Sequence, residues 1–245
     1  MSQEKSLDNK IHVVSLNMHK GTGWFTRKST LDRLREQIRQ LEPDLILLQE
    51  TQGTQFEFIA EEIWPHFSYG MNVSKDNGHH GNAILSKFPI VFSNNIDISK
   101  GSYERRGLLH TIIERPSCNS RVHLLCVHLG LFKNDRLKQL AQIVEYINAE
   151  IPLNDFLILG GDFNDLGSHA TAPLVEGLGL QETFLHFHGS YAKTFPAWAP
   201  LLRLDRIYCR GFDVHHARCL TDRAWKILSD HIAIEVFLNL KLSTI

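Results

Sequence analysis

The amino-acid sequence predicts an α/β fold in which two sheets pack together as a sandwich. Short apolar strands alternate with two clear amphipathic helices, as in α/β proteins generally. The later half of the chain is richer in short strands and loops, which suits two packed sheets better than one doubly wound parallel sheet. With 245 residues, 43% of them hydrophobic, the chain can bury a large core.

Each helix is predicted from apolar residues repeated at helical spacing between a start and a stop signal. The first follows Ser29-Thr30 and ends before Pro43, with a stripe of Leu31, Leu34, Ile38 and Leu41. The second follows Asn134-Asp135 and ends before Pro152, with a stripe of Leu137, Leu140, Val144 and Ile147. We expect both stripes to face the core.

Several apolar segments end in, or contain, a polar residue suited to catalysis or metal binding. They are residues 11–17 with Asn17, 45–50 with Glu50, 122–128 with His128, 156–162 with Asp162, 202–208 with Asp205, and 228–234 with Asp230 and His231. Taken singly, a terminal Glu is usually solvated, a lone His is more often a hydrogen-bonded core residue, and an Asp-Arg pair is commonly a surface ion pair. Their recurrence in one short chain favours a shared site.

The segment Gly161-Asp-Phe-Asn164 is the most informative of these. Alternate side chains of an extended segment share a face, so Asp162 and Asn164 are expected to emerge together at the end of a buried strand. A carboxylate and an amide placed in this way can hold and orient a water molecule. The other interpretation is a strand-end turn with an Asx hydrogen bond.

In order and spacing, these motifs resemble the endonuclease/exonuclease/phosphatase superfamily, whose fold is that of deoxyribonuclease I. The superfamily also includes abasic-site endonucleases, neutral sphingomyelinases and inositol-polyphosphate phosphatases. The similarity covers nearly the whole chain and rests on Ser-Leu-Asn17, Leu-Leu-Gln-Glu50, Gly81-Asn-Ala-Ile-Leu-Ser, Val-His128-Leu, Gly-Asp162-Phe-Asn, Leu-Asp205-Arg-Ile-Tyr and Ser-Asp230-His. It implies a four-layer α/β sandwich, with two packed mixed sheets flanked by helices and the site at one end of the sheets.

The resemblance also implies roles for individual residues. Glu50, Asn17 and Asp230 are expected to bind Mg²⁺ or Mn²⁺, since hard cations prefer oxygen ligands. Asp162, Asn164, His231, His128 and Asp205 are expected to be catalytic: Asp162 activates water with support from Asn164, and Asp205 fixes the tautomer of His231. Arg106, Arg105 and Asn82 are expected to contact the substrate phosphate, although Arg105 also suits a surface charge and Asn82 a role in shaping its strand. Many relatives carry an acid where this chain has His19, which bears on metal preference.

Composition narrows the setting but does not identify a substrate. The chain has 26 Lys and Arg against 27 Asp and Glu, and a formal charge of -1, so it has no global attraction to nucleic acid. We expect a polar tail at residues 1–10 and a single domain at 11–245. With no signal core, no membrane-spanning run and four scattered cysteines, a soluble cytoplasmic protein is expected.

Other enzyme classes fit less well. Ser229 lies directly beside Asp230 and His231, but consecutive residues cannot converge into a nucleophilic triad. The pairs at 79–80, 186/188 and 215–216 lack zinc-site spacing and are interpreted as loop histidines.

Two apolar segments leave the substrate open. Trp24-Phe25, flanked by Lys20, Arg27 and Lys28, suits either an amphipathic loop or a phosphate-and-stacking edge. Residues 195–202 (Phe-Pro-Ala-Trp-Ala-Pro-Leu-Leu) are expected to pack into the core; the alternative is contact with a membrane surface or an acyl chain.

The sequence therefore predicts a metal-dependent phosphodiesterase that uses in-line attack by an activated water. A nucleic acid, a lipid headgroup or a small molecule suits the site as substrate, peripheral membrane contact is one option, and no obligate protein partner is indicated. The alternative of another class is a non-catalytic module that binds phosphate ligands on the same fold.

Overall fold

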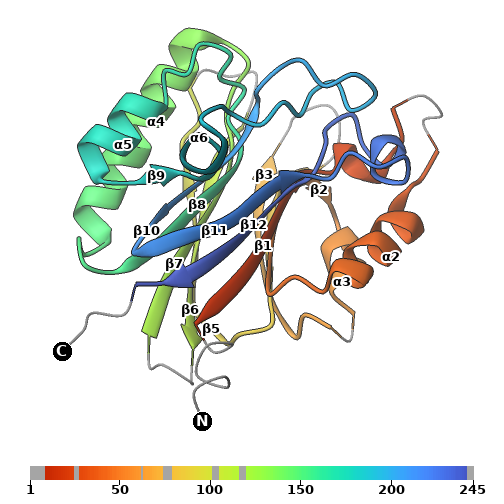
Figure 1. Ribbon diagram of the computed structural model, residues 1–245, viewed down its shortest axis with the longest axis horizontal. Helices are drawn as coiled ribbons and strands as arrows, with labels where there is room; N and C mark the ends of the chain where they lie inside the picture. Colours follow the sequence, from red (N-terminus) through yellow and green to blue (C-terminus); the bar gives the residue numbers. More distant parts are fainter. Residues whose placement is uncertain are drawn as a thin grey trace.

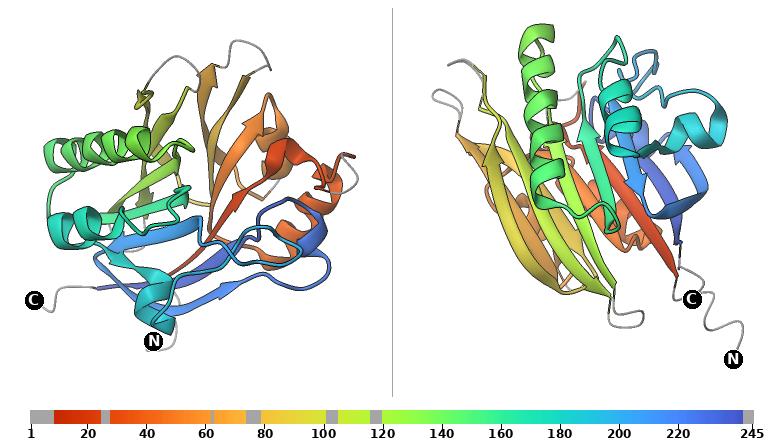
Figure 2. Two further views of the ribbon diagram at one scale, coloured as in Figure 1. Left: turned by 90° about the horizontal axis from the view of Figure 1, so that it is seen from above. Right: turned by 90° about the vertical axis from the view of Figure 1, so that its left-hand side faces the viewer.

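A computed structural model describes residues 9–24, 28–61, 63–73, 79–100, 105–115 and 120–241. Within them, two six-stranded sheets lie face to face, with orders β11-β12-β1-β2-β4-β3 and β5-β6-β7-β8-β10-β9. Helices cover the two outer faces, α2 and α3 on one side and α4 and α5 on the other (Figure 1, Figure 2). The predicted four-layer sandwich is confirmed.

The first sheet contains β1 (Lys10–Asn17), β2 (Leu45–Gln52), β3 (His66–Val73), β4 (His79–Ser86), β11 (Phe212–Cys219) and β12 (Ile234–Leu240). The second contains β5 (Ile90–Asp97), β6 (Gly107–Arg115), β7 (Ser120–His128), β8 (Phe156–Asp162), β9 (Gln181–Glu182) and β10 (Asp205–Arg210). Each sheet is mixed, because β1 runs parallel to β2 and β7 parallel to β8, while the other pairs are antiparallel.

The helices are α2 (Leu31–Leu41), α3 (Gln55–Ala60), α4 (Lys133–Glu150), α5 (Thr171–Leu178) and α6 (Thr183–His188), with 3-10 turns η1 (His19–Gly21) and η2 (Trp225–Ile227). No helix in the described part of the chain is long and apolar enough to cross a membrane.

The central strands are apolar on both faces because each face is covered. In β2, Leu45 and Leu47 point into the core between the sheets, whereas Ile46 and Leu48 pack in the outer layer with α2 and α3. In β8, Ile158 points inward and its neighbours Leu157 and Leu159 pack in the layer with α4 and α5. The continuous apolar runs of the sequence thus fill three hydrophobic layers.

The predicted helices form, with one correction. In α2 the buried residues are Leu34 and Ile38, as expected. In α4 the buried face is Arg136, Gln139, Leu140, Ile143 and Ile147, and the predicted Leu137 is 41% exposed. The face is rotated because Arg136 and Gln139 bond the loop before the helix: Nη1 of Arg136 donates to the carbonyl oxygen of Gly130 (3.2 Å), and Oε1 of Gln139 accepts from the Gly130 N–H (2.9 Å).

Three further expectations from the sequence can be compared with the structure. Cys126, Cys209 and Cys219 are free thiols, and Cys118 lies outside the described residues. The histidines interpreted as loop residues instead lie on β4, α6 and β11. Residues 195–202 are not core throughout: Ala197 is buried, but Trp198, Leu201 and Leu202 are exposed because they lie along a hairpin closed by the bridge between Phe195 and Leu202.

Candidate active site

The polar residues predicted from the strand ends converge at one end of the sandwich. Asn17 and Glu50 come from the first sheet, and His128, Asp162 and Asp205 from the second. Asp230 and His231 lie in the segment before β12. All of these except Asp205 line a cleft of about 650 Å³, and Asp205 lies behind His231.

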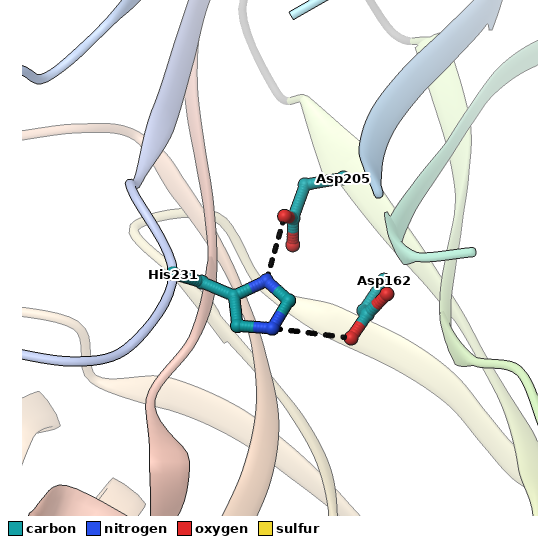
Figure 3. A group of neighbouring side chains, drawn as sticks. All are labelled: Asp162, Asp205 and His231. Atoms are coloured by element: carbon teal, nitrogen blue, oxygen red, sulfur yellow. Dashed lines mark hydrogen bonds and ion pairs between the residues drawn. The ribbon is translucent and has the colours of Figure 1, made fainter. Parts of the chain in front are cut away.

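His231 lies between two buried aspartates (Figure 3). Its Nδ1 is 2.8 Å from Oδ2 of Asp205, and its Nε2 is 3.7 Å from Oδ2 of Asp162. Burial alone would lower the pKa of His231, but the two carboxylates outweigh burial and raise this pKa to about 10. The ring is therefore a cation at neutral pH, held in orientation by Asp205.

Asp162 is almost completely buried at the centre of the site. Its Oδ2 accepts a hydrogen bond from Nδ2 of Asn17 (3.0 Å) and lies 3.5 Å from Nε2 of His128. Burial raises the pKa of Asp162 to about 6, and Asp205 contributes to the rise, while the charge of His231 opposes it. A carboxylate with a pKa near neutrality is suited to accept a proton.

His128 has the opposite electrostatic character to His231. Burial, followed by the positive charge of Arg106, lowers its pKa well below the ordinary value. The ring is therefore neutral at physiological pH and can donate one hydrogen bond without bringing charge.

Asn164 was expected to share a strand face with Asp162, but β8 ends at Asp162. The turn after β8 brings Asn164 to the cleft instead. The backbone of Asn164 is left-handed (φ 49°), and its N–H donates to Oδ1 of Asp162 at 2.9 Å. Its side-chain Nδ2 donates to the carbonyl oxygen of Leu129 (2.9 Å). The Asx turn and the shared site, offered as alternatives by the sequence, coexist here.

The predicted metal ligands all line the cleft. Nδ2 of Asn17 donates to Oε1 of Glu50 at 3.2 Å, and Oδ1 of Asp230 accepts from Ser229 at 3.3 Å. Glu50 has a left-handed backbone (φ 55°), next to a register shift between β2 and β4; such strain in a non-glycine residue is common at functional sites. Two carboxylates and an amide fit the oxygen-ligand preference of Mg²⁺ and Mn²⁺.

A second acidic group, formed by Asp162, Asp205 and His231, also has ligand atoms close enough to bind a metal, all within 4.8 Å of one another. Both ring nitrogens of His231, however, already face carboxylates. The charged imidazole balances the negative charge of the two aspartates.

His19 is the first residue of η1, two positions after Asn17. Its ring Nε2 lies 3.9 Å from Oδ2 of Asp230, and its backbone N–H donates to Oδ1 of Asn17 at 3.1 Å. His19 thus contacts two of the proposed metal ligands.

The three residues expected at the substrate phosphate differ in their placement. Arg106 is buried and lines the cleft, and Arg105, which lines it as well, pairs with exposed Asp97 at 3.2 Å. Asn82 is buried away from the described lining, where its Nδ2 donates to the carbonyl oxygens of Gly107 (3.0 Å) and Cys126 (3.1 Å). Asn82 therefore ties β4 of one sheet to β6 and β7 of the other.

Several residues that were not predicted as site residues also line the cleft, although Lys20, Phe195 and Leu202 lie in or beside segments whose role the sequence left open. His80, Lys20 and Arg136 add basic groups, and an apolar wall is formed by Leu131, Leu166, Phe195, Leu202 and Leu204. The one available signal for His80 was its position two residues before Asn82, on the same strand.

Comparison with known proteins gives a consistent result. The family model described as Endonuclease/Exonuclease/phosphatase family matches residues 14–231. YbhP of Escherichia coli K12, described as an uncharacterized protein, is 38% identical over 243 residues, covering 93% of this chain and 96% of YbhP.

Solved structures share the fold at low identity. The human Nocturnin catalytic domain with bound sulfate has a TM-score of 0.80 at 18% identity, covering 95% of each chain. TDP2 of D. rerio complexed with a single-strand DNA product has a TM-score of 0.74 at 21% identity, covering 94% of this chain and 99% of that chain. A mannosyl-6-phosphatase of Bacteroides thetaiotaomicron has a TM-score of 0.73 at 20% identity, covering 93% and 99%.

Proposed function

Since the chain belongs to the endonuclease/exonuclease/phosphatase family, whose members generally hydrolyse phosphate esters, we propose that it is a divalent-metal-dependent phosphodiesterase. The observation that carries the proposal is the buried cluster in which Asp162, His231 and Asp205 join a candidate base to a charged imidazole. Cleavage follows in-line attack by an activated water.

Asp162 accepts the proton of the attacking water. Its raised pKa, about 6, makes it a stronger base than an exposed aspartate, and it remains largely ionised at neutral pH. The hydrogen bonds from Asn17 and the Asn164 backbone hold the carboxylate in one orientation, and Asn164 itself supports the water or the developing phosphorane.

The phosphate oxygens are bound by a set of hydrogen-bond donors. His231 offers Nε2–H as a charged donor, because Asp205 holds the other ring nitrogen. His128 adds a neutral donor, and Arg106 adds a guanidinium suited to bidentate contact with phosphate. Donors already fixed in place stabilise charge that develops in the transition state.

Glu50, Asp230 and Asn17 would hold Mg²⁺ or Mn²⁺. A bound ion of this kind supplies positive charge to the phosphate oxygens and to the leaving group.

The proposal is tested by hydrolysis of bis-p-nitrophenyl phosphate with Mg²⁺, Mn²⁺ or EDTA. We expect turnover that needs a metal and that falls at least about 100-fold in Asp162→Asn and His231→Ala. Asp213→Asn is the matched control, because Asp213 pairs with Lys241 on the surface, outside the cleft. Folded protein without turnover in any metal would favour the non-catalytic phosphate-binding module.

Two substrate classes suit this phosphodiesterase, and different observations favour each of them. A nuclease is favoured by the fold shared with a TDP2 that is complexed with single-strand DNA, whereas the near-neutral charge of the chain favours a lipid or small-molecule diester. Placement in the cytoplasm remains a prediction from the sequence.

A further inference from the structure

Exposed apolar side chains lie on three loops that each contribute residues to the lining of the cleft. Leu131 and Phe132, between β7 and α4, are 63% and 69% exposed; Leu166, after β8, is 61% exposed; and Trp198 and Leu201, in the hairpin at 195–202, are 56% and 69% exposed. We call these five residues the apolar rim. Leu131 and Leu166 themselves line the cleft, so the rim is continuous with the candidate active site.

The hairpin is fixed beside the catalytic residues. The Leu201 N–H donates to the carbonyl oxygen of Phe195 at 2.9 Å, and the Ala197 N–H donates to that of Asp230 at 2.7 Å. The first bond closes the hairpin, and the second attaches it to the segment that contains Asp230 and His231. Trp198 and Leu201 nevertheless remain exposed to solvent. An exposed group of large apolar side chains around a polar cleft marks an interaction surface.

Basic residues accompany the rim. Lys133 follows Phe132, Arg203 follows Leu202, and both are exposed; Lys20 lines the cleft. These basic side chains place positive charge beside the rim, which favours an anionic partner. Leucine, which supplies three of the five rim residues, has no π-face on which a nucleic-acid base can stack. Apolar side chains between basic ones fit the interface of an anionic membrane.

We propose that the apolar rim docks the protein on an anionic lipid bilayer, presenting the headgroup phosphodiesters of that bilayer to the cleft. The cleavage of those headgroups rests on the proposed function, but docking does not, and it can be measured without turnover.

Docking is tested by vesicle flotation in EDTA, which prevents hydrolysis and excludes metal bridging. The vesicles contain phosphatidylcholine with about one-third phosphatidylglycerol, or phosphatidylcholine alone. We expect the wild-type protein to float with the anionic vesicles, and the triple variant Phe132→Ser, Trp198→Ser, Leu201→Ser to partition at least about tenfold less. Leu153→Ser is the matched control, because Leu153 is 73% exposed but precedes β8 at the opposite end from Asp162.

The single variant Trp198→Ser should lose part of the binding, and thermal unfolding shows whether each variant is folded. Wild-type protein that remains at the bottom with both vesicles would overturn the proposal, as would equal loss of binding in Leu153→Ser. Concentration-dependent dimerisation that the triple variant abolishes, without flotation of the wild-type protein, would assign the rim to a second copy instead.

The two proposals fail separately. Turnover of bis-p-nitrophenyl phosphate without flotation would remove docking and leave the phosphodiesterase. Flotation without turnover of that diester would remove the phosphodiesterase and leave docking. Protein that floats and cleaves the soluble diester, yet releases no product from the phosphatidylglycerol vesicles, would overturn the presentation of headgroups to the cleft.

Discussion

The Nδ1 atom of His231 lies 2.8 Å from Oδ2 of Asp205, a residue 26 positions earlier in the chain. Asp205 is the first residue of β10 and is buried. Its carboxylate fixes the ring of His231 in place and leaves Nε2 directed toward Asp162 (Figure 3).

Asp205→Asn should remove the charge while keeping the shape of the side chain. We expect kcat/KM to fall about 10²- to 10⁴-fold at neutral pH, because His231 loses both its orientation and the carboxylate that favours its charge. With Asp205 present the pKa of His231 is raised to about 10; without it, activity should decline with rising pH at a lower pH than in the wild type. A pH profile of the variant identical to that of the wild type would contradict this role.

Asn82→Ala should reduce stability more than catalysis. The two hydrogen bonds from Nδ2 to Gly107 and Cys126 join the sheets, and leaving both carbonyl oxygens without this donor should cost about 1–3 kcal/mol in the free energy of unfolding. Urea denaturation measures the loss, and steady-state kinetics should show KM within about twofold of the wild type. A large rise in KM with unchanged stability would restore the sequence-based expectation that Asn82 contacts substrate.

His110 should make the fold sensitive to acid. Its ring nitrogens lie 2.9 Å from the Tyr146 hydroxyl and 2.9 Å from Nδ1 of His123. Burial, together with the charge of His123, lowers the pKa of His110 to about 4. Between pH 6.5 and about 4 the unfolded chain takes up a proton that the folded chain resists, so stability should fall as the pH falls, by a few kcal/mol at most.

His110→Gln should flatten this dependence when the free energy of unfolding is measured by urea denaturation from pH 7 to pH 4. His215→Gln is the control, because His215 is exposed. An equally steep loss of stability in His110→Gln would assign the acid sensitivity to other groups.

Arg206→Lys should destabilise the protein although charge is conserved. Arg206 is fully buried, its Nη1 and Nη2 donate to Oδ2 (3.2 Å) and the backbone oxygen (2.6 Å) of Asp165, and its guanidinium lies 4.5 Å from the ring centre of Tyr191. Lys cannot reproduce the two-pronged contact, so we expect a loss of about 2–4 kcal/mol in a thermal or urea unfolding experiment. Arg223→Lys on the surface should change stability by less than about 0.5 kcal/mol.

The sequence predicted the fold because the apolar strands and the helix signals are local. The pattern of an apolar strand followed by a polar end located Asp162, His128 and Glu50, and all three line the cleft. It succeeded because the ends of neighbouring parallel strands meet at one edge, as β1 with β2 and β7 with β8.

The remaining features depend on contacts between distant segments. His80 reaches the cleft on β4, whose pairing partners are β2 and β3, and nothing in its local sequence fixes that pairing. Asn82 has the residue type of a phosphate ligand, yet its amide donates to carbonyl oxygens 25 and 44 positions away. Trp198 and Leu201 are as apolar as core residues, and only the closure of their hairpin leaves them in water.

The hydrogen bond from Asn17 to Asp162 joins residues 145 positions apart and crosses from one sheet to the other. His231 adds a third distant segment to the same cluster. The cluster therefore exists only while the two sheets are packed against each other. A change that loosens the contact between the sheets should dismantle it even if each sheet keeps its own strands paired.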